Sequence, residues 1–138
     1  MTMMDDEPLD WTLEEHIAAG QKALETIATD TSHTHPEPVC HHFSQLCPVD
    51  PMEMSVEETY QHLIPLYAAL GVDFLADRLE AWERLRPDNE WLLVRIRALF
   101  HAAAASGLSY DGWTWEPRNR QPVGACRFQV INNRTPEL

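Results

Sequence analysis

The chain has 138 residues, of which 44% are hydrophobic and 23% charged, and its formal net charge is −12. This length suits one domain, and the apolar content is high enough to bury a core, which argues against overall disorder. No apolar run approaches the ~18–20 residues that a membrane span needs. We therefore expect a single domain over residues 1–138 that does not associate with membranes.

The cysteine count and the N-terminus predict a cytoplasmic protein. Three cysteines, Cys40, Cys47 and Cys126, are too few for a disulfide framework. Residues 1–7 are acidic and lack the basic and apolar regions of a secretory signal.

The negative charge is concentrated in one part of the chain. Residues 1–90 contain 19 Asp and Glu but only four Lys and Arg, whereas residues 91–138 contain six Arg against three acids. A field of this sign repels nucleic acids and anionic membranes, and it steers the chain toward basic proteins. Solubility alone would also account for these charges.

In chain order, residues 1–11 form an acidic lead-in, and the first predicted element is a helix. Thr12-Leu13-Glu14-Glu15 is a capping box, and apolar residues then recur at helical spacing as far as Ala28. Residues 29–51 hold four prolines and no periodicity, which predicts a long loop rich in Pro and His. A loop of this length in a compact domain is usually functional or disordered.

Three further helices are predicted over residues 55–70, 73–86 and 88–107. Their signals are a capping box at Ser55–Glu58, a kink at Pro65, a stop at Gly71, caps at Asp73 and Asp88, and ends at Pro87 and Gly107. Because the connections are very short, we expect these helices to pack as antiparallel neighbours.

The last segment, residues 108–138, has a strand-like pattern. Residues 110–115 and 125–131 are rich in β-formers, and the second run alternates apolar and polar side chains. Trp113, Trp115 and Phe128 would attach this hairpin to the helices, since an isolated hairpin is marginal in water. The predicted fold is therefore mainly α, with about four helices over residues 12–107 and a C-terminal β-hairpin, in the α+β class.

A cluster of His and Cys within the predicted loop is the strongest chemical feature. It comprises His33, His35, Cys40, His41, His42 and Cys47. Thiolates and imidazoles are preferred zinc ligands, and a bound ion would order a Pro-rich segment. The cluster lacks the Cys-x₂-Cys pair of common zinc sites, so a polar loop with two small buried cysteines is the alternative. If zinc binds, we expect Cys40 and Cys47 to hold it with two of the four histidines, in an accessory or regulatory module.

The acidic residues suggest a different function. On the predicted third helix Asp73, Asp77 and Glu80 are spaced to form one stripe, and Glu53 and Glu57 form a shorter stripe before and on the second. Rows of carboxylates can imitate a phosphate backbone. We therefore predict a small, non-enzymatic binding protein that occupies a basic, nucleic-acid-binding surface of a protein partner without itself binding nucleic acid. An ordinary solvated face is the alternative.

Catalytic motifs are weak in this sequence. Cys40 beside His41 or His42 offers a nucleophile and a base, but residues adjacent in sequence rarely have the required geometry. The five glycines form no phosphate-binding loop. In size and acidity the chain resembles inhibitors carried by phages and plasmids, and immunity proteins that block toxins. An enzyme with a pocket between the helices and the hairpin remains the third hypothesis.

Overall fold

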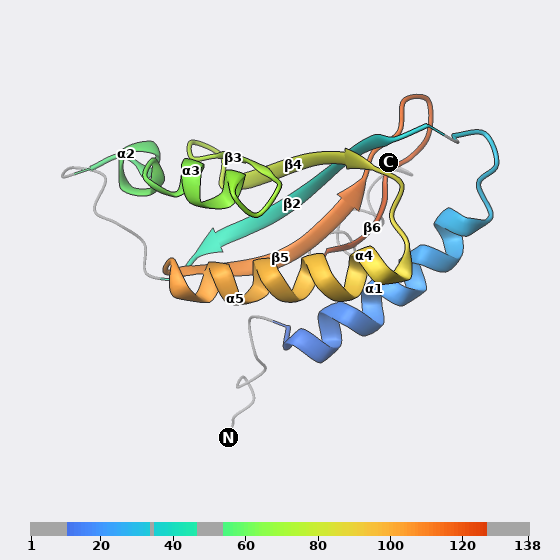
Figure 1. Ribbon diagram of the computed structural model, residues 1–138, viewed down its shortest axis with the longest axis horizontal. Coiled ribbons are helices and arrows are strands. Elements are labelled where there is room, and N and C mark those ends of the chain that lie inside the picture. Colours follow the sequence, from blue (N-terminus) through green and yellow to red (C-terminus); the bar gives the residue numbers. More distant parts are fainter. Residues whose placement is uncertain (1–10, 34, 47–53, 127–138) are drawn as a thin grey trace, which may run out of the picture.

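The computed structural model describes residues 11–33, 35–46 and 54–126, in which five strands form one antiparallel sheet (Figure 1). The strands are β2 (Glu37–Gln45), β3 (Asp73–Leu75), β4 (Glu80–Leu85), β5 (Leu108–Trp115) and β6 (Val123–Cys126), in the spatial order β3-β4-β2-β5-β6. The helices are α1 (Leu13–Ala28), α2 (Val56–Tyr60), α3 (Leu63–Ala68), α4 (Asn89–Trp91), the π-helical turn η1 (Leu92–Ile96) and α5 (Arg97–Ala105). None of the helices in these residues is long and apolar enough to cross a membrane.

The predicted mainly α fold with a C-terminal hairpin is wrong, because the sheet is the centre of the molecule. β4 and β5 both pair antiparallel with β2, so they run parallel to each other and are connected through the continuous helical segment 89–105. β5 and β6 do form the predicted hairpin, but β5 is also an inner strand of the sheet. Phe128, the third residue expected to attach the hairpin, lies outside the described residues.

The predicted loop over residues 29–51 contains the central strand β2. Val39 and His41 are completely buried, and the strand pairs with β4 on one side and β5 on the other. The partner strands β4 and β5 lie some 40 and 70 residues further along the chain, so no local sequence pattern predicts the strand β2. Residues 47–51 at the end of the predicted loop lie outside the described residues.

The predicted helix over residues 73–86 is also wrong, since this segment is the hairpin β3–β4. Leu79, at φ 54°, lies in the turn that joins the two strands. The apolar residues of segment 73–86 fit helical spacing, but short apolar runs fit strands equally well. Without this helix, the predicted antiparallel bundle does not exist.

The remaining helix signals are largely confirmed. Both capping boxes form, with Thr12 opening α1 and Ser55 opening α2. Asp88 caps the segment 89–105. The predicted helix over 55–70 is divided at Gln61–His62, and Pro65 lies in the first turn of α3, where its missing N–H costs no helical bond.

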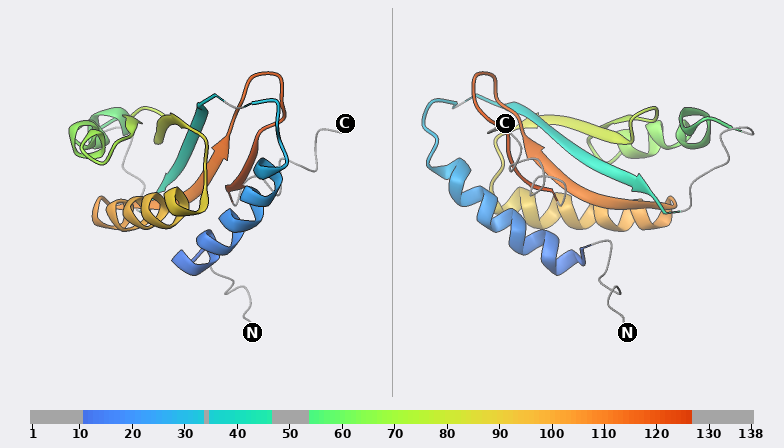
Figure 2. Two further views of the ribbon diagram at one scale, coloured as in Figure 1. Left: turned by 45° about the vertical axis from the view of Figure 1, so that its right-hand side comes forward. Right: turned by 180° about the vertical axis from the view of Figure 1, so that it is seen from behind.

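The core lies between the sheet and the helices α1 and α5, which cover the same face (Figure 2). Leu92, Ile96, Leu99 and Ala103 form a fully buried stripe on the helical segment. Trp113 and Trp115 of β5 and Val39 of β2 belong to the same apolar cluster. This arrangement gives β2 one face toward the helices and one face away from them.

Candidate metal centre

Side chains alternate along β2, so Cys40 and His42 share the face that points away from the helices. Cys40 is directly opposite Thr114 of β5, and His42 is opposite Gly112. The backbone N–H of Glu116 donates to the carbonyl of Pro38 at 2.8 Å, which extends this pairing by one residue. Glu116 therefore lies on the same face as Thr114 and Cys40.

Cys40, His42 and Glu116 form a group whose ligand atoms all lie within 4.8 Å of one another, and such a group could hold a metal ion. The Sγ atom of Cys40 is 3.9 Å from Nδ1 of His42. Nε2 of His42 lies 3.1 Å from the hydroxyl of Thr114, and that hydroxyl donates to Glu116 at 2.6 Å. Thr114 thus connects His42 to Glu116, and His42 in turn contacts Cys40.

The hydrogen bonds of Thr114 indicate which nitrogen of His42 carries the ring proton. Its single proton is directed at Glu116, so its oxygen accepts from Nε2–H of His42. Nδ1 of His42 is then unprotonated, and its lone pair faces the sulfur of Cys40. A metal-binding histidine commonly donates its other ring nitrogen in this way, which holds the ring in one orientation.

Burial keeps the Cys40 thiol and the His42 imidazole uncharged in the metal-free protein. Burial, together with the charges of Glu80 and Glu116, raises the pKa of the Cys40 thiol well above its usual value. Burial lowers the pKa of His42, which favours the neutral imidazole that a metal requires. The sulfur of Cys40 would bind a cation as thiolate, so metal binding would release its proton.

His41, the neighbour of both candidate ligands along β2, faces the helices and belongs to a different cluster. Its Nε2–H donates to Glu83 at 2.6 Å, and its Nδ1 accepts from the hydroxyl of Tyr110 at 2.7 Å. Glu83 also accepts from the guanidinium of Arg95 at 3.1 Å and from Trp91 at 3.2 Å. His41 is therefore a satisfied core residue, and it lies on the wrong face to bind the same metal.

Of the other predicted ligands that lie in the described residues, neither His33 nor His35 joins Cys40 and His42. His33 contacts the carboxylate of Asp30 at 3.1 Å and the carbonyl of Arg118 at 2.9 Å. His35 is exposed, and Cys47 lies outside the described residues. Glu116 was not predicted from the sequence, because only the register of β2 with β5 brings it beside a histidine 74 positions earlier in the chain.

The predicted acidic stripe is absent, because its residues lie on a hairpin. Asp73 begins β3 and Glu80 begins β4. Asp77 lies in the turn between them, 3.7 Å from the guanidinium of Arg78. Glu57 is in the first turn of α2, and Glu53 lies outside the described residues.

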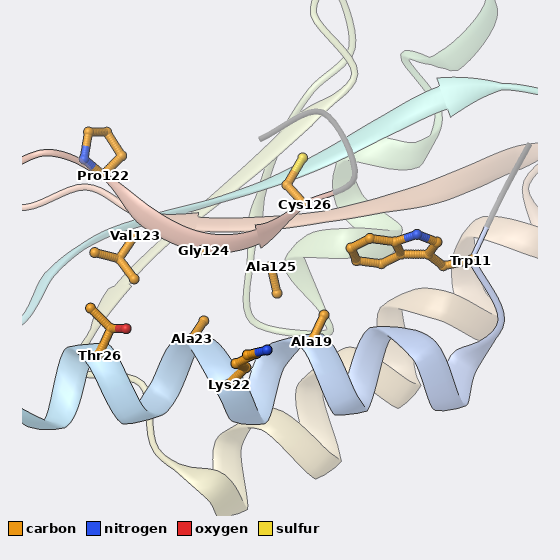
Figure 3. Close-up of a pocket in the computed structure, with 10 residues that line it drawn as sticks. All are labelled: Trp11, Ala19, Lys22, Ala23, Thr26, Pro122, Val123, Gly124, Ala125 and Cys126. Carbon is orange, nitrogen blue, oxygen red and sulfur yellow. The ribbon is translucent and has the colours of Figure 1, made fainter. Parts of the chain in front are cut away.

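A separate cavity of about 380 Å³ lies between α1 and β6 (Figure 3). Ala19 and Ala23 of α1 and Val123 and Ala125 of β6 give it small apolar walls, and Lys22 lies at its side. Cys126 points away from α1 in this view. Cys126 is opposite Gly112 of β5, and Gly112 is opposite His42 of β2. Cys126 therefore lies on the same sheet face as Cys40 and His42, two strands away from His42.

Comparisons with protein-family models, with curated proteins and with solved structures gave no match for this chain.

Proposed function

We propose that this protein binds one divalent metal ion, with Zn²⁺ preferred, through Cys40, His42 and Glu116. The observation that carries this proposal is the convergence of a thiol, an imidazole and a carboxylate within 4.8 Å on one sheet face. Borderline cations such as zinc are bound by this combination of sulfur, nitrogen and oxygen ligands.

The distance between sulfur and nitrogen supports a tetrahedral ion. Zinc bonds of about 2.3 Å to sulfur and about 2.1 Å to nitrogen, at a tetrahedral angle, separate these two atoms by about 3.6 Å. The distance from Cys40 Sγ to His42 Nδ1 is 3.9 Å. A side-chain adjustment of a few tenths of an ångström would therefore bring both atoms into bonding range.

A bound ion would connect two strands that lie far apart in sequence. Cys40 and His42 come from β2, and Glu116 follows β5 directly. Because the unfolded chain has no preformed site, the free energy of metal binding would add to the stability of the folded state. We therefore propose that the bound ion stabilises the fold of a non-enzymatic module and does not take part in catalysis.

A cysteine-nucleophile enzyme is the second candidate, favoured by the contact between Cys40 and His42. Thr114 contacts Nε2 of His42 and donates to Glu116. These two residues would orient the imidazole as the third residue of a catalytic triad orients its base. However, Cys40 is only 1% exposed, and burial raises the pKa of its thiol. A nucleophilic cysteine needs the opposite environment, electropositive and accessible, so the geometry supports the metal site better.

Calorimetric titration of chelator-treated protein with Zn²⁺ tests the proposal. We expect one ion per wild-type chain, and binding that is at least 10-fold weaker in Cys40→Ser, His42→Gln and Glu116→Gln. The matched controls are His35→Gln and Glu25→Gln, which change exposed side chains of the same types and should bind as wild type. Equal binding by His42→Gln and His35→Gln would exclude this site. Rapid alkylation of Cys40 by iodoacetamide in the folded protein would instead favour the nucleophile.

Binding of a basic partner by the acidic surface stays a prediction. The negative charge of residues 1–90 still favours such a partner, and Asp73, Asp77 and Glu57 are exposed. These three residues now lie on three separate elements instead of helical stripes. Individual exposed carboxylates contribute little, so this binding would depend on several of them acting together.

A further inference from the structure

Glu80 faces the candidate metal centre from the strand on the other side of β2. In the pairing of β2 with β4, Glu80 is directly opposite His42, and Trp82 is directly opposite Cys40. Residues opposite each other in antiparallel strands project from the same face, with Cβ atoms about 4.5–5.5 Å apart. The two candidate ligands of β2 therefore have Glu116 on the β5 side and Glu80 on the β4 side.

The carboxylate of Glu80 is held close to this face by Trp82. The indole N–H of Trp82 donates to Oε1 of Glu80 at 3.2 Å. This bond leaves Oε2 available as a ligand, and ligand carboxylates in metal sites are commonly held by such a second hydrogen bond.

We infer that Glu80, which lies outside the group of ligand atoms within 4.8 Å of one another, turns its side chain toward the ion as the fourth protein ligand and closes the site. This inference rests on the proposed metal-binding function. With Cys40, His42 and Glu116, Glu80 completes a set of one thiolate, one imidazole and two carboxylates. The ligands then come from the three adjacent segments β4, β2 and the end of β5, so one ion cross-links the middle of the sheet.

A fourth protein ligand, Glu80, determines which metal ions the site selects and whether the bound ion is structural or catalytic. Structural zinc sites have four protein ligands in a tetrahedron, whereas catalytic sites keep one position for water or substrate. Mg²⁺ and Ca²⁺ prefer six or more oxygen ligands, and a site with sulfur and nitrogen in a tetrahedron disfavours them. The site is thus a structural one, selective for Zn²⁺ and its spectroscopic substitute Co²⁺.

Titration of chelator-treated protein with Co²⁺ tests this role of Glu80. The visible bands of Co²⁺ are strong in a tetrahedral site and weak in a five- or six-coordinate one. We expect wild type to show the strong bands, and Glu80→Gln to bind Co²⁺ more than 100-fold more weakly with weak bands. Trp82→Phe should lose only about 10–100-fold, as is usual for an outer partner of a ligand. Asp73→Asn is the matched control, because Asp73 is opposite Trp82 on the same face.

Glu80→Asp keeps the carboxylate and provides a second variant. It should recover part of the affinity that Glu80→Gln loses, which a merely structural role of the glutamate side chain would not explain. Glu80→Gln with wild-type affinity and wild-type bands would overturn the inference and leave the three-ligand site standing. Failure of wild type to bind Co²⁺ or Zn²⁺ at all would overturn both the inference and the proposed function.

Discussion

At the scale of single residues, adjacent histidines on β2 have opposite surroundings. His42 is a candidate ligand of the metal centre, whereas His41 is buried against the helices between Glu83 and Tyr110. Burial lowers the pKa of His41, so it is the neutral donor to Glu83. Burial alone would raise the pKa of Glu83, but the bond from His41 and the charge of Arg95 outweigh this effect and lower it.

Replacing Glu83 by Gln should strongly destabilise the fold. The side chain of Glu83 is 6% exposed, and its loss leaves the half-buried guanidinium of Arg95 and the buried imidazole of His41 without their carboxylate partner. Breaking a buried ion pair from one side typically costs about 3–5 kcal/mol. Urea unfolding followed by circular dichroism measures this cost. Glu25→Gln, at an exposed position, should change stability by less than about 0.5 kcal/mol, and a similarly small loss in Glu83→Gln would contradict the prediction.

The pair of His33 and Asp30 predicts a pH dependence of stability. The hydrogen bond to Asp30 raises the pKa of His33 above its ordinary value of 6.5. The folded state therefore holds this proton more tightly than the unfolded state. The resulting stabilisation is complete below pH 6.5 and is lost as the pH rises through the folded-state pKa of His33.

Wild type and His33→Gln should therefore differ more in stability at pH 6 than at pH 8.5. Urea unfolding of both proteins at the two pH values, in the presence of chelator, gives the comparison. A difference that is the same at both pH values would show that the imidazole proton of His33 does not contribute to folding.

At the scale of elements, local signals predicted α1 and the helical segment 89–105 but not the sheet. Capping boxes and caps are local, so the sequence shows them directly. β2 contains Pro38 and two histidines, and it is a strand because β4 and β5 supply its hydrogen-bond partners. The polar atoms of His41 are satisfied by Glu83 and Tyr110, which lie 42 and 69 residues away.

The candidate site shows the same limit. Cys40 and His42 were predicted as metal ligands, because their chemistry is visible in the sequence. Glu116 and Glu80 could not be chosen from 22 acidic residues, since only strand register places them beside β2. A helix at residues 40–46 would have separated Cys40 from His42, whereas a strand puts residues i and i+2 on one face.

The bulge between β2 and β5 gives a prediction at this scale. The register shifts between His42 and Phe43, and Gly112 there has φ 127°, which L side chains rarely adopt. A Cβ atom at Gly112 would also overlap the backbone of Ala125 and Cys126. Gly112→Ala should therefore destabilise the protein by at least the ~1–3 kcal/mol of backbone strain.

Thermal unfolding measures this loss. Gly107→Ala is a suitable comparison, because Gly107 also has a positive φ, of 80°, but a Cβ atom there meets nothing within 4 Å. Gly112→Ala should have the lower melting temperature of the two. Equal melting temperatures would contradict the overlap with β6.

At the scale of the whole molecule, the sheet depends on its C-terminal strands. β5 supplies Trp113 and Trp115, which are 1% and 0% exposed, and it pairs with both β2 and β6. A fragment of residues 1–107 would leave one edge of β2 unpaired and the apolar stripe of α5 uncovered. We expect this fragment not to unfold cooperatively in urea, and a soluble, cooperatively folded fragment would show that the sheet does not need β5.

The metal centre connects the same strands, so its ligand set is the central claim. X-ray absorption at the zinc edge of the Zn²⁺-loaded protein reads this set directly. We predict one sulfur at about 2.3 Å and three nitrogen or oxygen ligands at about 2.0–2.2 Å, with the sulfur lost in Cys40→Ser. Two sulfur ligands, as a site built from Cys40 and Cys47 would give, or no sulfur ligand at all, would contradict the account.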